Sequence, residues 1–147
     1  MLPGLMTAGF GVALGMRSVA GIAGVAAALV IVSGLARASA GVFVLDPLGD
    51  SRPPSFSEWI HNAAGTIYIV TLILAVLAWF VALRTRRRPP GWFAWYSLVT
   101  AVAAIAVPFA LIGTGLATTA DVGLFQRASF GVLNVWILVL AATESRS

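Results

Sequence analysis

The stretch WIHNAAGTIYIVTLILAVLAWFVAL at residues 59–83, followed directly by RTRRRPP at residues 84–90, decides the fold of this chain. The first part contains no Asp, Glu, Lys or Arg, and as a helix rising 1.5 Å per residue it would measure about 37 Å. That length is sufficient to cross the hydrocarbon layer of a bilayer, which is about 30 Å thick. The sequence therefore predicts a membrane-spanning helix, with the arginine-rich segment as the loop that follows it.

The composition of the whole chain agrees with a membrane environment. Of its 147 residues, 60% are hydrophobic and 10% are charged, whereas a soluble domain is about 45–50% apolar and about 25% charged. So few charged side chains cannot cover the surface of a water-soluble fold of this size. The sequence contains no cysteine, which excludes disulfides, thiolate metal sites and cysteine nucleophiles.

Three further apolar runs are long enough to span a bilayer. With the stretch above, the predicted spans cover residues 19–45, 59–83, 92–116 and 122–142. Residues 1–16 are also apolar, but this run is short and contains Pro3 and four glycines, so we expect only a partial span there. The predicted fold class is all-α: a single membrane domain over residues 1–147, a transmembrane bundle of four full spans plus a short N-terminal apolar helix fragment.

The distribution of arginines predicts the orientation of the bundle. Short loops rich in arginine stay on the cytoplasmic side, so the loop 84–90 and the C-terminus are expected in the cytoplasm. The loops 46–58 and 117–122 then lie outside. All nine basic residues are arginine, and alanine, glycine and valine dominate, a composition typical of GC-rich bacterial genomes. We therefore expect a multi-pass protein of the bacterial inner membrane.

The expected partners follow from the same features. The main partner is the lipid bilayer, and the arginine tract is an ordinary topology signal, so no nucleic acid is expected. Ala20, Gly24 and Ala28 recur at four-residue intervals, and small residues at this spacing let membrane helices approach closely. This face is predicted to contact a neighbouring helix, which could belong to a second copy of the chain or to a partner helix that completes the bundle.

Polar and ionisable residues gather at the outer ends of the predicted spans. The set comprises Arg37, Asp46, Glu58, His61, Asn62, Asp121, Gln126 and Arg127. Charged groups in or beside lipid are costly unless they are paired, so we expect at least one ion pair that joins Arg37 or Arg127 to a carboxylate of this set. The set is a candidate structural cluster and a candidate binding site for a lipid headgroup or a small polar ligand.

His61 is the candidate catalytic residue, because imidazole titrates near neutral pH and can act as a general base. In this alternative the chain is a membrane-embedded hydrolase-type enzyme in which Asp46 or Glu58 orients the ring. One histidine and scattered carboxylates are a poor basis for a metal site, and the sequence contains no phosphate-binding loop and no nucleophile elbow. We therefore expect neither a metal nor a cofactor.

The start of the second full span carries a helix-capping pattern. Ser55 and Glu58 are three residues apart, as in a capping box, in which each side chain accepts a hydrogen bond from the other residue's backbone N–H. The helix is therefore expected to begin near Phe56.

Three short motifs, each at the outer end of a predicted span, resemble a known family. They are Asp46-Pro47, then HNAAG at residues 61–65, then GLFQR at residues 123–127 leading to Trp136. In this order they resemble the bacterial multi-pass membrane family catalogued as domain of unknown function 998, over roughly residues 19–142. The resemblance implies a helical bundle with more spans than this chain offers, hence an N-terminally shortened member. It implies no reaction, because the activity of the family is not established.

Overall fold

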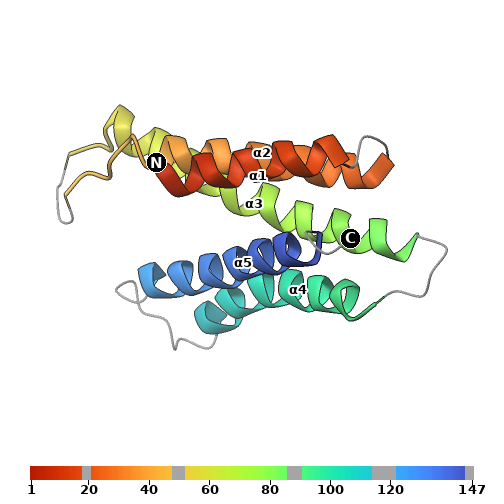
Figure 1. The fold of residues 1–147 in the computed structure, drawn as a ribbon. Helices are drawn as coiled ribbons and strands as arrows, with labels where there is room; N and C mark the ends of the chain where they lie inside the picture. Colours follow the sequence, from red (N-terminus) through yellow and green to blue (C-terminus); the bar gives the residue numbers. More distant parts are fainter. Residues whose placement is uncertain (18–20, 48–51, 86–90, 114–121, 145–147) are drawn as a thin grey trace. The chain divides into compact units, whose positions relative to one another are not determined.

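The computed structural model describes residues 1–17, 21–47, 52–85, 91–113 and 122–144. In these ranges the chain forms helices and no strands. The helices are α1 (Leu2–Arg17), α2 (Gly21–Ala40), α3 (Phe56–Arg84), α4 (Trp92–Gly113) and α5 (Val122–Glu144), shown in Figure 1. The all-helical fold class predicted from the sequence is confirmed.

Three of these helices are long and apolar enough to cross a membrane. They are Gly21–Ala40, Phe56–Arg84 and the part of α5 from Arg127 to Glu144, and α4 contributes a shorter apolar helix, Trp92–Ala106. Each of the four expected spans therefore corresponds to a helix. The chain has the architecture of a helical membrane protein.

The chain forms two compact units, Met1–Ala75 and Val76–Ser147, and their boundary falls inside α3. Unit 1 contains α1, α2 and the first part of α3, and unit 2 contains the rest of α3 with α4 and α5. Each unit has its own packing contacts. That residues 1–147 form a single membrane domain stays a prediction.

In unit 1, α1 and α2 form an antiparallel hairpin whose backbones touch. A Cβ atom built on Gly4 would lie 2.7 Å from the carbonyl oxygen of Gly34, and one built on Gly34 would lie 2.7 Å from the carbonyl oxygen of Gly4. Gly11 makes the same kind of approach to Ile31, whose backbone nitrogen would lie 2.8 Å from the added atom. Distances below 3.0 Å essentially never occur for real Cβ atoms, so the hairpin requires glycine at these positions.

The face of α2 that packs on α1 is centred on residues other than Gly24 and Ala28. Ala28 is exposed and Gly24 is half-buried, whereas Ala27 and Gly34 are buried, and Ala20 lies outside the described residues. The side of the helix that meets α1 passes through Ala27, the residue before Ala28, and contact of the face of Ala20, Gly24 and Ala28 with another helix stays a prediction. One residue corresponds to a rotation of about 100° around the helix axis.

The first full span ends earlier than expected. Helix α2 stops at Ala40 rather than near residue 45, and residues 44–47 are not helical. The backbone N–H of Gly41 donates to the carbonyls of Arg37 and Ala38, which closes the last turn. The expected short N-terminal helix is present as α1, whose 16 residues would measure about 24 Å, less than the bilayer's hydrocarbon thickness.

We predict that Gly34→Ala lowers the free energy of unfolding by about 2–3 kcal/mol, because the added methyl group would meet the Ala8 backbone, which has no rotamer to move. Gly9→Ala is the matched control: a Cβ at Gly9 meets nothing within 4 Å, so this change should stabilise α1 by up to about 1 kcal/mol. Unfolding by denaturant titration in detergent measures both values. Equal effects of the two substitutions would contradict the backbone contact.

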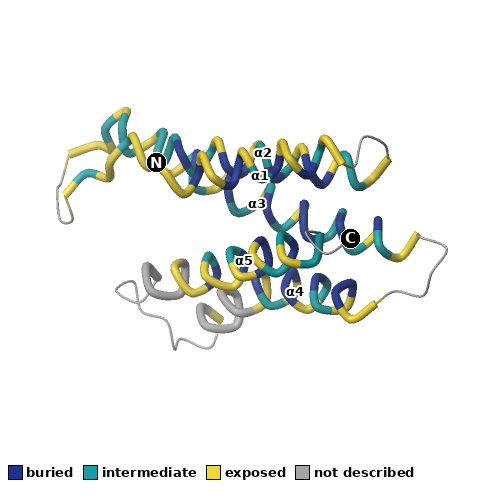
Figure 2. The backbone as a smooth tube through the Cα atoms, in the orientation of Figure 1, coloured by how far each residue is buried: buried dark blue, intermediate teal, exposed yellow. Residues whose placement is uncertain are grey.

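In unit 2, α4 and α5 are joined by a buried contact that combines aromatic stacking with a hydrogen bond. Figure 2 shows the buried positions of both helices in dark blue. The indole Nε1–H of Trp136 donates to Ser97 Oγ at 2.9 Å, and Ser97 Oγ donates to the Phe93 carbonyl at 2.9 Å. The rings of Trp136 and Phe93 stack with centroids 6.3 Å apart. Trp136 and Ser97 are fully buried, so the serine hydroxyl satisfies a donor that water cannot reach.

Ser97→Ala should cost about 1–3 kcal/mol of unfolding free energy, because it leaves the buried indole N–H of Trp136 without its acceptor. Ser39→Ala is the control, since the Ser39 hydroxyl is exposed and bonds back to the Leu35 carbonyl of its own helix; this change should cost less than about 0.5 kcal/mol. The same denaturant titration measures both. A Ser97→Ala protein as stable as the wild type would show that the indole contact does not stabilise unit 2.

Candidate functional site

In unit 1, polar residues close the loop after α2 onto the start of α3. Ser55 donates twice to Asp46: its hydroxyl to Oδ1 at 2.7 Å and its backbone N–H to Oδ2 at 2.7 Å. Ser57 Oγ donates to the Val44 carbonyl at 2.9 Å and accepts the Val44 N–H at 3.0 Å. Each pair joins one residue before the loop to one at the start of α3.

His61 completes this series one turn further along α3. Its Nδ1 lies 2.8 Å from the carbonyl oxygen of Phe43. We call the six residues that bond in this way the loop clasp: Phe43, Val44, Asp46, Ser55, Ser57 and His61. The pairs run in antiparallel order, so the clasp fixes the register of the loop against α3.

The helix start confirms half of the predicted capping box. Ser55 Oγ accepts the backbone N–H of Glu58 at 3.2 Å, and α3 begins at Phe56 as expected. The other half differs: the Ser55 N–H donates to Asp46 rather than to Glu58. A carboxylate from across the loop replaces the one expected three residues along the helix.

The contact with Phe43 defines the chemistry of His61. A backbone carbonyl can only accept a hydrogen bond, so Nδ1 carries the proton and donates it. In the neutral ring the lone pair then lies on Nε2. The half-buried imidazole is thus oriented by a carbonyl, and neither Asp46 nor Glu58 is the group seen to orient it.

Arg37 lies in the same unit, near the end of α2. Its guanidinium carbon is 5.4 Å from the centroid of the Tyr68 ring, and Tyr68 is 3% exposed. A cation over an aromatic face contributes about 0.5–2 kcal/mol, and more where it is desolvated. This contact gives the half-buried charge a partner on α3. The expected ion pair between an arginine and a carboxylate stays a prediction.

The other predicted site residues are spread more widely. Glu58 is half-buried in the first turn of α3, Asn62 is exposed, and Arg127 is exposed on α5 in unit 2. Asp121 and the side chain of Gln126 lie outside the described residues. The structure thus brings together Asp46 and His61 through the clasp, and a single cluster of all eight residues stays a prediction.

The described parts of the chain hold no group of three or more His, Asp or Glu side chains that could bind a metal ion. The clasp carboxylate of Asp46 is already bonded by two groups of Ser55. The expectation that no metal or cofactor binds stays a prediction.

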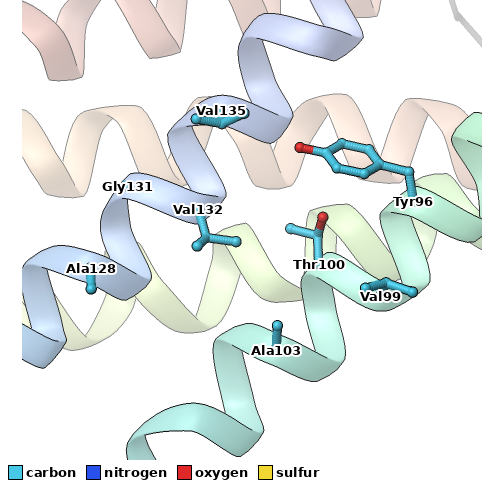
Figure 3. A pocket seen from close by; sticks show the side chains of 8 residues that line it. All are labelled: Tyr96, Val99, Thr100, Ala103, Ala128, Gly131, Val132 and Val135. Atoms are coloured by element: carbon cyan, nitrogen blue, oxygen red, sulfur yellow. The ribbon is translucent and has the colours of Figure 1, made fainter.

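Unit 2 contains a second feature, an apolar groove between α4 and α5 (Figure 3). Its volume is about 460 Å³. Its lining consists of Tyr96, Val99, Thr100, Ala103, Ala128, Gly131, Val132 and Val135. The Tyr96 ring reaches from α4 over one end of the groove toward α5.

The family model described as Protein of unknown function (DUF998) matches residues 1–143. The chain belongs to this family. No curated protein and no solved structure matches it.

The DUF998 match includes α1, which extends the resemblance beyond the residues 19–142 expected from the motifs. All three motifs lie inside the matched region. Membership supports the membrane architecture and assigns no reaction. That this DUF998 member is N-terminally shortened stays a prediction.

Sequence reasoning missed two parts of this DUF998 structure. Ser57 gave no signal, since it bonds the backbone of Val44, and a backbone partner carries no sequence pattern. The groove had a partial signal in Ala128 and Gly131, two small residues three apart that lie on one side of a helix. The residues of α4 that lie opposite them could not be predicted, because the sequence does not show that α4 and α5 pack together.

The clasp predicts a graded response at Asp46. Asp46→Ala should lower the unfolding free energy by about 1–2 kcal/mol, because it frees both Ser55 donors, whereas Asp46→Asn keeps one acceptor oxygen and should cost about half as much. Hydrogen exchange at the amides of Val44 and Ser55 should accelerate in the same order. Exchange rates that are equal in the Ala variant and the wild type would rule out the clasp as the restraint on the loop.

Proposed function

We propose that this chain is a non-enzymatic multi-pass protein of the bacterial inner membrane, in which the outward-facing polar cluster is a structural clasp. The observation that carries the proposal is the contact of His61 Nδ1 with the Phe43 carbonyl. It stands in series with the two serine contacts at Val44 and Asp46. Groups arranged in this way satisfy backbone atoms at the point where the chain leaves the membrane.

The surroundings of the clasp favour a lipid interface. Val44 and Leu45 are exposed on the loop, and Phe56 and Trp59 are exposed on the first turn of α3, the last two by 76% and 68%. Aromatic side chains collect at the headgroup level of membranes, where one end of the ring is apolar and the surface is polar. The clasp would hold this apolar edge at the interface, with Arg37 close to the headgroup phosphates.

The arginine-rich segment supports the proposed orientation. Arg84 ends α3 at the opposite end of the helix from Phe56, and the sequence continues with three more arginines at 86–88. Short basic loops remain in the cytoplasm. The clasp would then face the outside of the cell, and loop 84–90 and the C-terminus the cytoplasm.

The second candidate function is a membrane-embedded hydrolase with His61 as general base. One observation favours it: a ring that donates through Nδ1 to a carbonyl keeps its Nε2 lone pair for proton abstraction. A lipid ester at the membrane surface would be the substrate class. The clasp requires Nδ1 of the His61 ring, whereas hydrolysis requires Nε2.

Two substitutions at His61 separate them. In His61→Asn the side-chain NH₂ can take the place of Nδ1–H, so a clasp should lose less than about 0.5 kcal/mol, whereas His61→Ala should lose about 1–3 kcal/mol. Neither variant retains Nε2. Unfolding free energy in detergent and hydrolysis of p-nitrophenyl butyrate and of phosphatidylglycerol vesicles are measured for the wild type and both variants.

The clasp predicts that stability follows the order His, Asn, Ala and that none of the three proteins hydrolyses either ester above the rate of empty detergent. Hydrolysis by the wild type that disappears in the folded Asn variant would overturn the proposal in favour of the enzyme. Equal stability of the Asn and Ala variants would overturn the structural role of Nδ1.

A further inference from the structure

The groove between α4 and α5 lies in unit 2 and takes no part in the loop clasp. Apart from the Tyr96 ring and the hydroxyls of Tyr96 and Thr100, its lining side chains are aliphatic or absent. A Cβ atom built on Gly131 would meet nothing within 4 Å, so the space above this glycine is open. On a membrane-facing surface such a space is filled by hydrocarbon, because water finds no partners there.

The dimensions of the groove fit one lipid tail. On α4 its described lining runs from Tyr96 to Ala103, a separation of seven residues, which corresponds to about 10 Å along the helix. One leaflet contributes about 15 Å of the roughly 30 Å hydrocarbon layer. Over this described length the groove can hold part of one acyl chain within a leaflet.

The Tyr96 end of the groove has the chemistry of a headgroup site. The rings of Trp92 and Tyr96 lie 6.1 Å apart in the first turns of α4. The guanidinium carbon of Arg84 lies 5.6 Å from the centroid of the adjacent Trp95 ring. Arg84 and Trp95 are exposed. An arginine held over an aromatic face keeps its planar fork of N–H donors available for a phosphate.

We propose that this groove binds one acyl chain of an anionic phospholipid, whose phosphate lies at the Arg84 and Tyr96 end. The apolar lining selects for hydrocarbon and the arginine for negative charge. Charge complementarity favours a lipid as the occupant, since Arg84 is exposed at this end and three more arginines follow at residues 86–88, and the phosphate of an anionic lipid is the complementary charge at a membrane surface. This inference does not depend on the role of the loop clasp.

The test uses the full-length protein, delipidated in detergent. Native mass spectrometry counts bound phosphatidylglycerol and phosphatidylcholine that carry the same acyl chains. A single arginine near a membrane surface favours an anionic lipid by about fivefold, so the wild type should bind phosphatidylglycerol about fivefold more tightly. Arg84→Gln should remove this preference and leave phosphatidylcholine binding unchanged.

Gly131→Leu tests the tail site, because the new side chain enters open space and should fill the groove without disturbing the fold. It should weaken the binding of both lipids by about tenfold. Gly9→Leu is the matched control: its Cβ also meets nothing within 4 Å, it lies outside the lining, and it should leave lipid binding unchanged. Circular dichroism verifies that all variants remain helical.

Three results would overturn the proposal. Unchanged lipid binding by a folded Gly131→Leu protein would show that the groove is not the tail site. A phosphatidylglycerol preference that survives Arg84→Gln would show that Arg84 does not hold the headgroup. Loss of a cross-linked dimer in Gly131→Leu, with lipid binding intact, would show that a second copy covers the groove.

Discussion

Water is absent from the hydrocarbon layer, so every polar group of a spanning helix must bond within the protein or lie at a membrane surface. Several hydroxyls in both units follow this constraint, whereas two buried polar atoms of unit 2, Trp79 Nε1 and Ser129 Oγ, have no hydrogen-bond partner among the described residues. The hydroxyls of Ser33 and Thr71 donate to carbonyls of their own helices, and that of Ser97 also accepts the indole N–H of Trp136. The remaining polar chemistry is displaced to the helix ends, where the loop clasp forms.

The same constraint removes the usual force that packs helices together. Lipid tails are as apolar as leucine, so helices in a membrane associate through close contact rather than through expulsion of water. The α1–α2 hairpin achieves this with glycines whose Cβ positions are occupied by the facing backbone, as at Gly4 and Gly34. Unit 2 achieves it with the ring stack of Phe93 and Trp136. The two units of the chain therefore pack their helices by different kinds of contact.

The sequence predicted those features that depend on residues near one another along the chain. The apolar run at residues 59–83 predicted α3, and Ser55 predicted its first turn, because a helix and its cap are local structures. The second half of the cap was missed, since Asp46 reaches Ser55 across a loop. For a related reason the sequence did not show which side of α2 meets α1: small residues mark a helix that packs closely, but the side that faces a given partner depends on the pairing.

The clasp and the groove together describe a chain whose polar groups stabilise its ends and whose apolar surface meets lipid. Both depend on α3 carrying the chain across the membrane once. Since the sequence has no cysteine, a single introduced thiol is a unique label. Arg52→Cys and Thr85→Cys place it on exposed residues beyond either end of α3. With a membrane-impermeant maleimide, the account predicts labelling of the Arg52→Cys variant in intact cells and of the Thr85→Cys variant only after lysis. Labelling of both variants in intact cells would contradict it.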